Sequence, residues 1–124
     1  MCKLLMSINP VHVNNILAGT KRFEFRKTKC KKSIDAILIY STFPIKKVVA
    51  EVEVTEIIEG TPQSIWHKTS SAAGVDKSFF DKYYAGKNNA VAYALGRITQ
   101  YRKPLQLEDF GIKAAPQSYV YVCD

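Results

Sequence analysis

The chain has 124 residues, of which 47% are hydrophobic, and a formal net charge of +7 at pH 7. This length fits one domain, residues 1–124, with a core of its own, and the apolar content excludes disordered and fibrous proteins. No apolar run approaches the ~20 residues that cross a bilayer, and the N-terminus lacks the pattern of a signal peptide, so we expect a cytoplasmic protein without membrane contact.

The positive charge is concentrated in the first part of the chain. Residues 1–48 hold ten Lys and Arg residues and two acidic ones, a net charge of +8, whereas residues 49–124 have a net charge of −1. A basic half on a nearly neutral body indicates an anionic partner, most often nucleic acid. For Lys29, Lys31 and Lys32, a role in solubility is at least as good an explanation.

The first third of the chain predicts a strand at residues 3–8 and then a short helix. Asn9 and Pro10 are typical of a helix start, and Gly19 is typical of a helix end because glycine adopts left-handed backbone angles without penalty. The buried face of this helix is expected to consist of Val13, Ile16 and Leu17. His12 flanks that face, where a histidine is more often incidental than a ligand.

The next strand, residues 21–27, alternates charged residues with phenylalanine. One face is expected to carry the charged side chains of Arg22, Glu24 and Arg26. Two arginines around a glutamate can bind phosphate or carboxylate and still offer one acceptor or base. A solvated strand whose ion pairs add little stability is the alternative. Lys21 can join Glu24 and Arg26 only if it lies before regular strand pairing begins.

Further strands are predicted at residues 34–42, 47–59, 90–101 and 119–123. Two helices, capped by Thr61 and Asp76, are inserted between the strands at residues 47–59 and 90–101. The second of these helices carries an aromatic cluster, which fits a core more often than a base-stacking surface: Phe79, Phe80, Tyr83 and Tyr84. A small closed or half-closed barrel, mostly antiparallel, is the most economical way to remove strand edges.

The three cysteines, Cys2, Cys30 and Cys123, lie far apart, and the two histidines are not spaced to join them in a zinc site. We therefore predict no metal and no cofactor. Cys2 and Cys123 fall in terminal strands that can be neighbours. A disulfide between them is possible, although reduced thiols are more usual in a cytosolic chain.

Several segments together resemble the signature of ASCH domains in the PUA-like superfamily, chiefly Gly19-x-Lys21-x-x-Glu24-x-Arg26 after the Asn9-Pro10 helix start. Other segments resemble small stand-alone members regarded as possible transcriptional regulators: Tyr40-Ser41-Thr42, Gly60-Thr61-Pro62 and Ala115-Pro116-Gln117-Ser118. The resemblance spans nearly the whole chain. It implies an α+β fold, a small PUA-like antiparallel β-barrel with a short N-terminal helix and two inserted helices. The charged motif would line a cleft that binds RNA or a nucleotide.

Enzymes also occur among the proteins that this chain resembles. Small bacterial relatives are similar to amidohydrolases that deacylate acetylcytidine, and nuclease activity is proposed for others. The essential lysine of the amidohydrolases matches Lys21, but Glu24 replaces their threonine. Their glutamate would fall near Gly74 or Val75, where this chain has no carboxylate, and the nearby Asp76 is expected to cap a helix.

Three functional hypotheses result. The first is an RNA- or nucleotide-binding module with a regulatory role in transcription or translation, whose site consists of Lys21, Arg22, Glu24, Arg26, Ser41, Thr42, Lys46, Gln117 and Ser118. The second is an amidohydrolase or nuclease acting on modified nucleosides or RNA, with Lys21 and Glu24 as an acid–base pair. The third is a module whose basic face meets an acidic protein partner.

Overall fold

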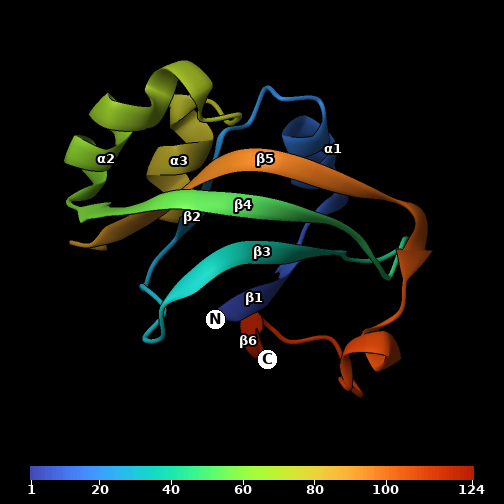
Figure 1. Ribbon diagram of the computed structural model, residues 1–124. Coiled ribbons are helices and arrows are strands. Elements are labelled where there is room, and N and C mark those ends of the chain that lie inside the picture. Colours follow the sequence, from blue (N-terminus) through green and yellow to red (C-terminus); the bar gives the residue numbers. More distant parts are fainter.

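The computed structural model describes residues 1–124 and contains one strongly curved six-stranded sheet with three α-helices (Figure 1). The strands are β1 (Cys2–Ile8), β2 (Phe23–Arg26), β3 (Ile34–Ser41), β4 (Lys47–Gly60), β5 (Ala90–Leu105) and β6 (Tyr119–Cys123). The helices are α1 (Pro10–Leu17), α2 (Pro62–Thr69) and α3 (Lys77–Tyr83). The predicted mixed α+β composition, with a short first helix and two inserted helices, is confirmed.

The sheet has the strand order β2-β5-β4-β3-β1-β6, and it is not a closed barrel. Adjacent strands are antiparallel except for β1 and β3, which run parallel. No ladder joins β2 to β6 or β1, so of the two predicted forms, closed and half-closed, the closed barrel is wrong. We call this gap between β2 and the β1–β6 pair the open side of the sheet. The strand β2 has only four residues, and side chains rather than a ladder connect it across the open side.

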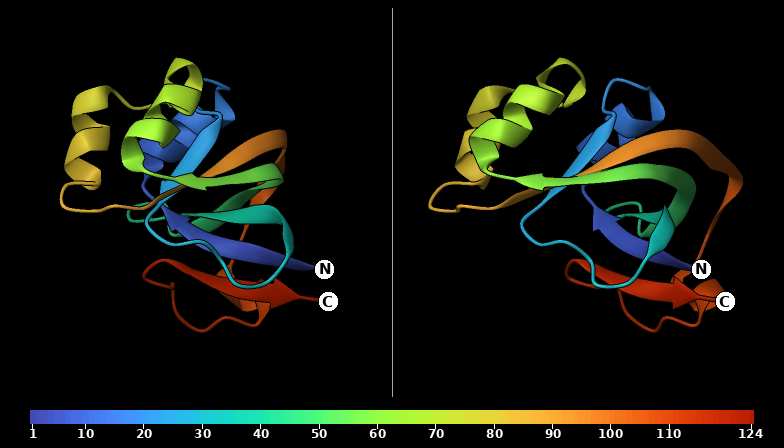
Figure 2. Two further views of the ribbon diagram at one scale, coloured as in Figure 1. Left: turned by 90° about the vertical axis from the view of Figure 1, so that its left-hand side faces the viewer. Right: turned by 60° about the vertical axis from the view of Figure 1, so that its left-hand side comes forward.

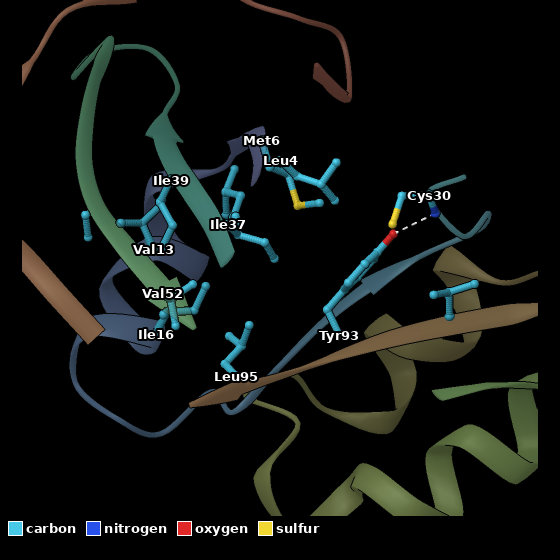
Figure 3. Close-up of a cluster of buried hydrophobic side chains, with 13 residues drawn as sticks. Leu4, Met6, Val13, Ile16, Cys30, Ile37, Ile39, Val52, Tyr93 and Leu95 are labelled. Atoms are coloured by element: carbon cyan, nitrogen blue, oxygen red, sulfur yellow. Dashed lines mark hydrogen bonds between the residues drawn. The ribbon is translucent and has the colours of Figure 1, made fainter. Parts of the chain in front are cut away.

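The largest part of the core lies inside the curve of the sheet (Figure 3). It combines inward side chains of β1, β3, β4 and β5 with two residues of α1, Val13 and Ile16. Ala50 and Val52 of β4 are fully buried in this cluster, whereas Val48 is buried in a separate cluster with Leu38 and Tyr40, because the register of β3 and β4 shifts between Ile39 and Tyr40. Burial of such apolar surface is the main term that stabilises the sheet.

Helices α2 and α3 lie together at one end of β4 and β5 (Figure 1). Their predicted caps are present: the Thr61 hydroxyl accepts from the Ser64 amide, and the Asp76 carboxylate accepts from the Phe79 amide. A second apolar cluster joins these helices to the sheet and includes Phe80 of α3. The two helices therefore cover one end of the sheet and place α3 beside β2.

The two chain ends lie side by side (Figures 1 and 2). Cys2 and Cys123 face each other in the β1–β6 ladder and form a disulfide, so the expectation that reduced thiols are more usual is corrected. The ladder itself brings the two sulfurs together, because directly opposed residues of antiparallel strands have their Cβ atoms about 5 Å apart. Cys30 is a free, buried thiol. No helix has the length and apolar character needed to cross a membrane.

Candidate functional site

A cavity of about 200 Å³ lies where the end of β1, the start of α1, strand β2 and helix α3 meet. In the right view of Figure 2, β2 lies between α1 on one side and the α2–α3 pair on the other. The cavity is lined by Ser7, Ile8, Asn9, His12, Lys21, Glu24, Phe25, Arg26, Val75, Phe79, Phe80 and Tyr83. The structure thus brings together Lys21, Glu24 and Arg26.

Lys21 is a buried lysine that lies two residues before β2. Only 3% of the residue is exposed, its Nζ donates to the Ala73 carbonyl at 3.1 Å, and it lies 4.7 Å from the centre of the Phe25 ring. Because Lys21 precedes the regular strand, its side chain does not have to follow the alternation of β2 and can point to the same side as Glu24 and Arg26. This meets the condition that the sequence set for Lys21 to join them. Burial lowers the pKa of Lys21; Glu24 opposes this effect, and Arg26 adds to it.

The glycine that follows Ala73 makes room for Lys21. Gly74 has a φ of +72°, which favours glycine, and a Cβ at this position would overlap the Lys21 side chain. Val75 lines the cavity, while Asp76 caps α3. No carboxylate therefore stands where the amidohydrolases have their glutamate.

Glu24 and Arg26 form a largely buried ion pair. One carboxylate oxygen of Glu24, Oε2, accepts from Arg26 Nε at 3.2 Å and from Arg26 Nη2 at 3.0 Å. Arg26 also donates to the Ser7 carbonyl at 3.0 Å and to the Ser118 hydroxyl at 3.2 Å. The guanidinium thus connects β2 with the end of β1 and the start of β6 across the open side, and the other oxygen of Glu24, Oε1, accepts no hydrogen bond from the protein.

His12 is a cavity residue that the sequence had indicated to be incidental. Its Nδ1 atom is buried without a hydrogen-bond partner, and its ring packs edge-on against Phe79, with the centroids 5.3 Å apart. Burial lowers the pKa of His12, and the cations of Lys21 and Arg26 lower it further against the opposing effect of Glu24. The sequence feature that could have identified His12 as a site residue is its position in the first turn of α1, directly after the end of β1, which forms part of the cavity wall.

The aromatic residues of α3 divide between core and cavity. Phe80 and Tyr84 are buried in the core, as predicted, although Phe80 also reaches the cavity wall; Phe79 and Tyr83 line the cavity and are only partly covered. Burial raises the pKa of Tyr83. The prediction that these aromatic residues belong to the core therefore holds for two of the four.

Six of the nine predicted site residues do not line the cavity: Arg22, Ser41, Thr42, Lys46, Gln117 and Ser118. Ser41 is buried at the end of β3, whereas Arg22, Lys46 and Gln117 are exposed. Ser118 receives the hydrogen bond from Arg26. Binding roles for these residues stay predictions. No group of three or more His, Cys, Asp or Glu side chains that could hold a metal is present.

The sequence profile of the ASCH domain matches residues 6–102. The chain is 32% identical over 102 residues to the large ribosomal subunit protein uL22 of Ureaplasma parvum; these residues are 82% of the chain but only 33% of that protein's length. It is 28% identical over 105 residues to an ASCH domain-containing ribonuclease of Zymomonas mobilis, covering 84% of the chain and 70% of the ribonuclease.

The fold is shared with solved structures. The crystal structure of ASCH from Zymomonas mobilis matches with a TM-score of 0.87 at 24% sequence identity, covering 98% of this chain and 87% of that one. Because the family profile matches most of the chain and the fold agrees over nearly its whole length, this protein belongs to the ASCH domain family.

Proposed function

We propose that this protein binds single-stranded RNA and holds one nucleotide of it in the cavity beside β2. The observation that carries the proposal is the convergence of Lys21, Glu24 and Arg26, all from the basic half of the chain, in one concave, partly aromatic site. The cavity has a volume of about 200 Å³. It lies below the ~300 Å³ typical of small-molecule sites, so a single nucleobase fits the size better than a duplex.

The free hydrogen-bonding groups of the site favour an anionic or amino-bearing guest. Lys21 has three N–H donors and uses one on Ala73, so two can reach a ligand. Arg26 has five donors and uses four within the protein, so its main effect is to orient Glu24. Oε1 of Glu24 is then available to accept from an exocyclic amine of a base.

Two aromatic rings in the lining add a second mode of recognition. Phe79 and Tyr83 offer partly covered faces on which an unstacked base can pack. The protein has no helix with several basic residues that would enter a DNA groove. The similarity to an ASCH domain-containing ribonuclease also supports RNA as the ligand.

The test is binding of a short single-stranded RNA, measured by fluorescence anisotropy from low to moderate salt. Lys21→Met should weaken binding at least tenfold, because it removes the main free cation while an apolar side chain of similar length still fills the buried site. Lys113→Met, at an exposed lysine outside the cavity, is the matched control. Equal affinity of the Lys21→Met variant and the natural protein would refute the proposal.

A second candidate function is cleavage of the bound RNA, which the ribonuclease relative favours. In this reaction the 2′-oxygen forms a bond to the adjacent phosphorus, and the bond from phosphorus to the 5′-oxygen breaks. Glu24 would take the proton of the 2′-hydroxyl through Oε1, and Lys21 would give a proton to the leaving 5′-oxygen. The absence of a carboxylate at Gly74 and Val75 makes deacylation of a modified nucleoside the weaker alternative.

Cleavage is tested with end-labelled RNA under the conditions that support binding. Glu24→Gln should retain binding and lose product formation, and the natural protein should give fragments ending in a 2′,3′-cyclic phosphate. RNA that stays intact in the presence of the natural protein would rule cleavage out and leave the binding proposal untouched. A regulatory role in transcription or translation remains a prediction.

A further inference from the structure

The loop between β2 and β3 carries an unpaired cluster of positive charge. Four lysines, all exposed, occur within six residues: Lys27, Lys29, Lys31 and Lys32. None of them takes part in an ion pair, although other lysines of the protein do: Lys3 pairs with two carboxylates and Lys77 with one. We call residues 27–32 the basic loop. Its charge is therefore free to meet an external anion.

The basic loop is held in place by its backbone rather than left free. Cys30 is buried, and its amide donates to the Tyr93 hydroxyl at 3.1 Å (Figure 3). The amides of Lys31 and Lys32 donate to the Tyr121 hydroxyl at 2.8 and 3.3 Å. Two tyrosines from β5 and β6 thus fix the backbone of the loop while its lysines stay exposed, which lowers the entropy lost on binding.

Aromatic rings also hold two of the four ammonium groups. Nζ of Lys27 lies 4.7 Å from the ring centre of Tyr83, and Nζ of Lys32 lies 4.9 Å from that of Tyr121. Since Tyr83 lines the cavity, Lys27 lies beside a residue of the cavity wall. The basic loop follows directly after Arg26, so it begins next to a cavity residue.

We propose that the basic loop binds the phosphates of the RNA strand next to the nucleotide held in the cavity. The inference rests on the proposed RNA-binding function and extends its site beyond the cavity. The loop offers no exposed apolar side chain, because Cys30 is its one apolar residue and is buried. A protein interface needs an apolar centre, whereas a phosphate backbone needs only closely spaced cations, so the loop fits RNA better than an acidic protein.

The test compares a mononucleotide with an RNA of about eight nucleotides, a length within the usual range of single-strand sites. The variant is Lys29→Gln, Lys31→Gln and Lys32→Gln together; Lys27 is kept because it contacts a cavity residue. We expect unchanged affinity for the mononucleotide and weaker binding of the longer RNA. The slope of log affinity against log salt should fall by about 2, since each phosphate contact on a single strand contributes about 0.7.

A matched variant removes the same charge elsewhere, at three exposed lysines outside the cavity: Lys87, Lys103 and Lys113. Equal losses for the two triple variants, or no loss for the loop variant, would overturn the proposal. An acidic peptide that displaces the longer RNA at equal charge concentration would overturn it in favour of a protein partner.

Lys21→Met separates this inference from the proposed function. If Lys21→Met abolishes mononucleotide binding and the loop variant affects only the longer RNA, both proposals stand. If the loop variant weakens binding of the longer RNA and Lys21→Met leaves the affinity for both ligands unchanged, the cavity proposal fails, and the loop is not an extension of the cavity site. If Lys21→Met weakens binding and the loop variant does not, only the extension fails.

Discussion

Two parts of the curved sheet are held together by different contacts. Strand ladders and apolar packing hold one part, and side-chain hydrogen bonds hold the other. On one side, β5, β4, β3 and β1 form continuous ladders, and their inward faces are apolar and fully covered. On the open side, β2 has no strand partner beyond β5, and side chains of Arg26 and Tyr121 make the connections instead.

The contrast explains where the site lies. A buried strand edge leaves backbone polar groups that side chains must satisfy, so polar and charged residues gather there. Side chains fill the gap less completely than a ladder would, and the cavity occupies the remaining space. Stability should therefore depend mainly on the ladders, and ligand binding mainly on the open side.

The largest effect is expected in the ladder region. Ile39 of β3 is fully buried in the main cluster, so Ile39→Ala should lower the free energy of unfolding by about 2–5 kcal/mol through lost burial and an unfilled cavity. Urea denaturation measures this change. RNA affinity of the folded variant should equal that of the natural protein, and a loss comparable with that of Lys21→Met would contradict the division between the two regions.

Arg26→Ala should lower both the stability of the fold and the affinity for RNA. Glu24 would then keep an unpaired carboxylate in a site where its side chain is only 9% exposed, and we expect a loss of about 2–3 kcal/mol in unfolding free energy. The double variant Glu24→Gln with Arg26→Ala should recover most of that loss without recovering RNA binding. If the double variant is as unstable as Arg26→Ala alone, the instability comes from the contacts to Ser7 and Ser118.

Two glycines with the same backbone angle allow a sharper comparison. Gly74 and Gly86 have φ values of +72° and +73°, but a Cβ would overlap Lys21 only at Gly74, whereas nothing lies within 4 Å at Gly86. Both alanine variants should lose about 1 kcal/mol from backbone strain. Gly74→Ala should lose more stability than Gly86→Ala in thermal unfolding. In RNA titrations Gly74→Ala should lose most of its affinity, while Gly86→Ala should bind normally.

The smallest effect is a pH dependence that separates Lys21 from other lysines. Because burial lowers its pKa below the 10.5 of an ordinary lysine, the folded protein loses this proton before the unfolded chain does. Between the two pKa values the unfolded chain binds more protons, so this residue's contribution to stability rises with pH.

Anion binding should change in the opposite direction over the same pH range. Mononucleotide affinity should fall as pH rises and Lys21 loses its charge, at a lower pH than for an ordinary lysine, and Lys21→Arg, which stays cationic, should remove that fall. The measurement is a mononucleotide titration at fixed ionic strength. An equal decline in the Lys21→Arg variant would assign the pH dependence to another group.

Much of the architecture was determined by the sequence itself. Strand periodicity, the helix starts at Asn9, Thr61 and Asp76, and the motif from Gly19 to Arg26 depend on local backbone and side-chain preferences, which a sequence carries directly. These features predicted five or six strands, three helices, a resemblance to the family and the grouping of Lys21, Glu24 and Arg26.

The tertiary structure alone decided whether the sheet closes, whether the terminal cysteines pair and which polar residues reach the cavity. His12 and Tyr83 enter the site, and Ser41 does not, because the curvature of the sheet brings α1 and α3 together across β2. The pairing of β1 with both β3 and β6 likewise depends on residues far apart in the chain. Such contacts arise from packing between distant segments, and no local preference specifies them.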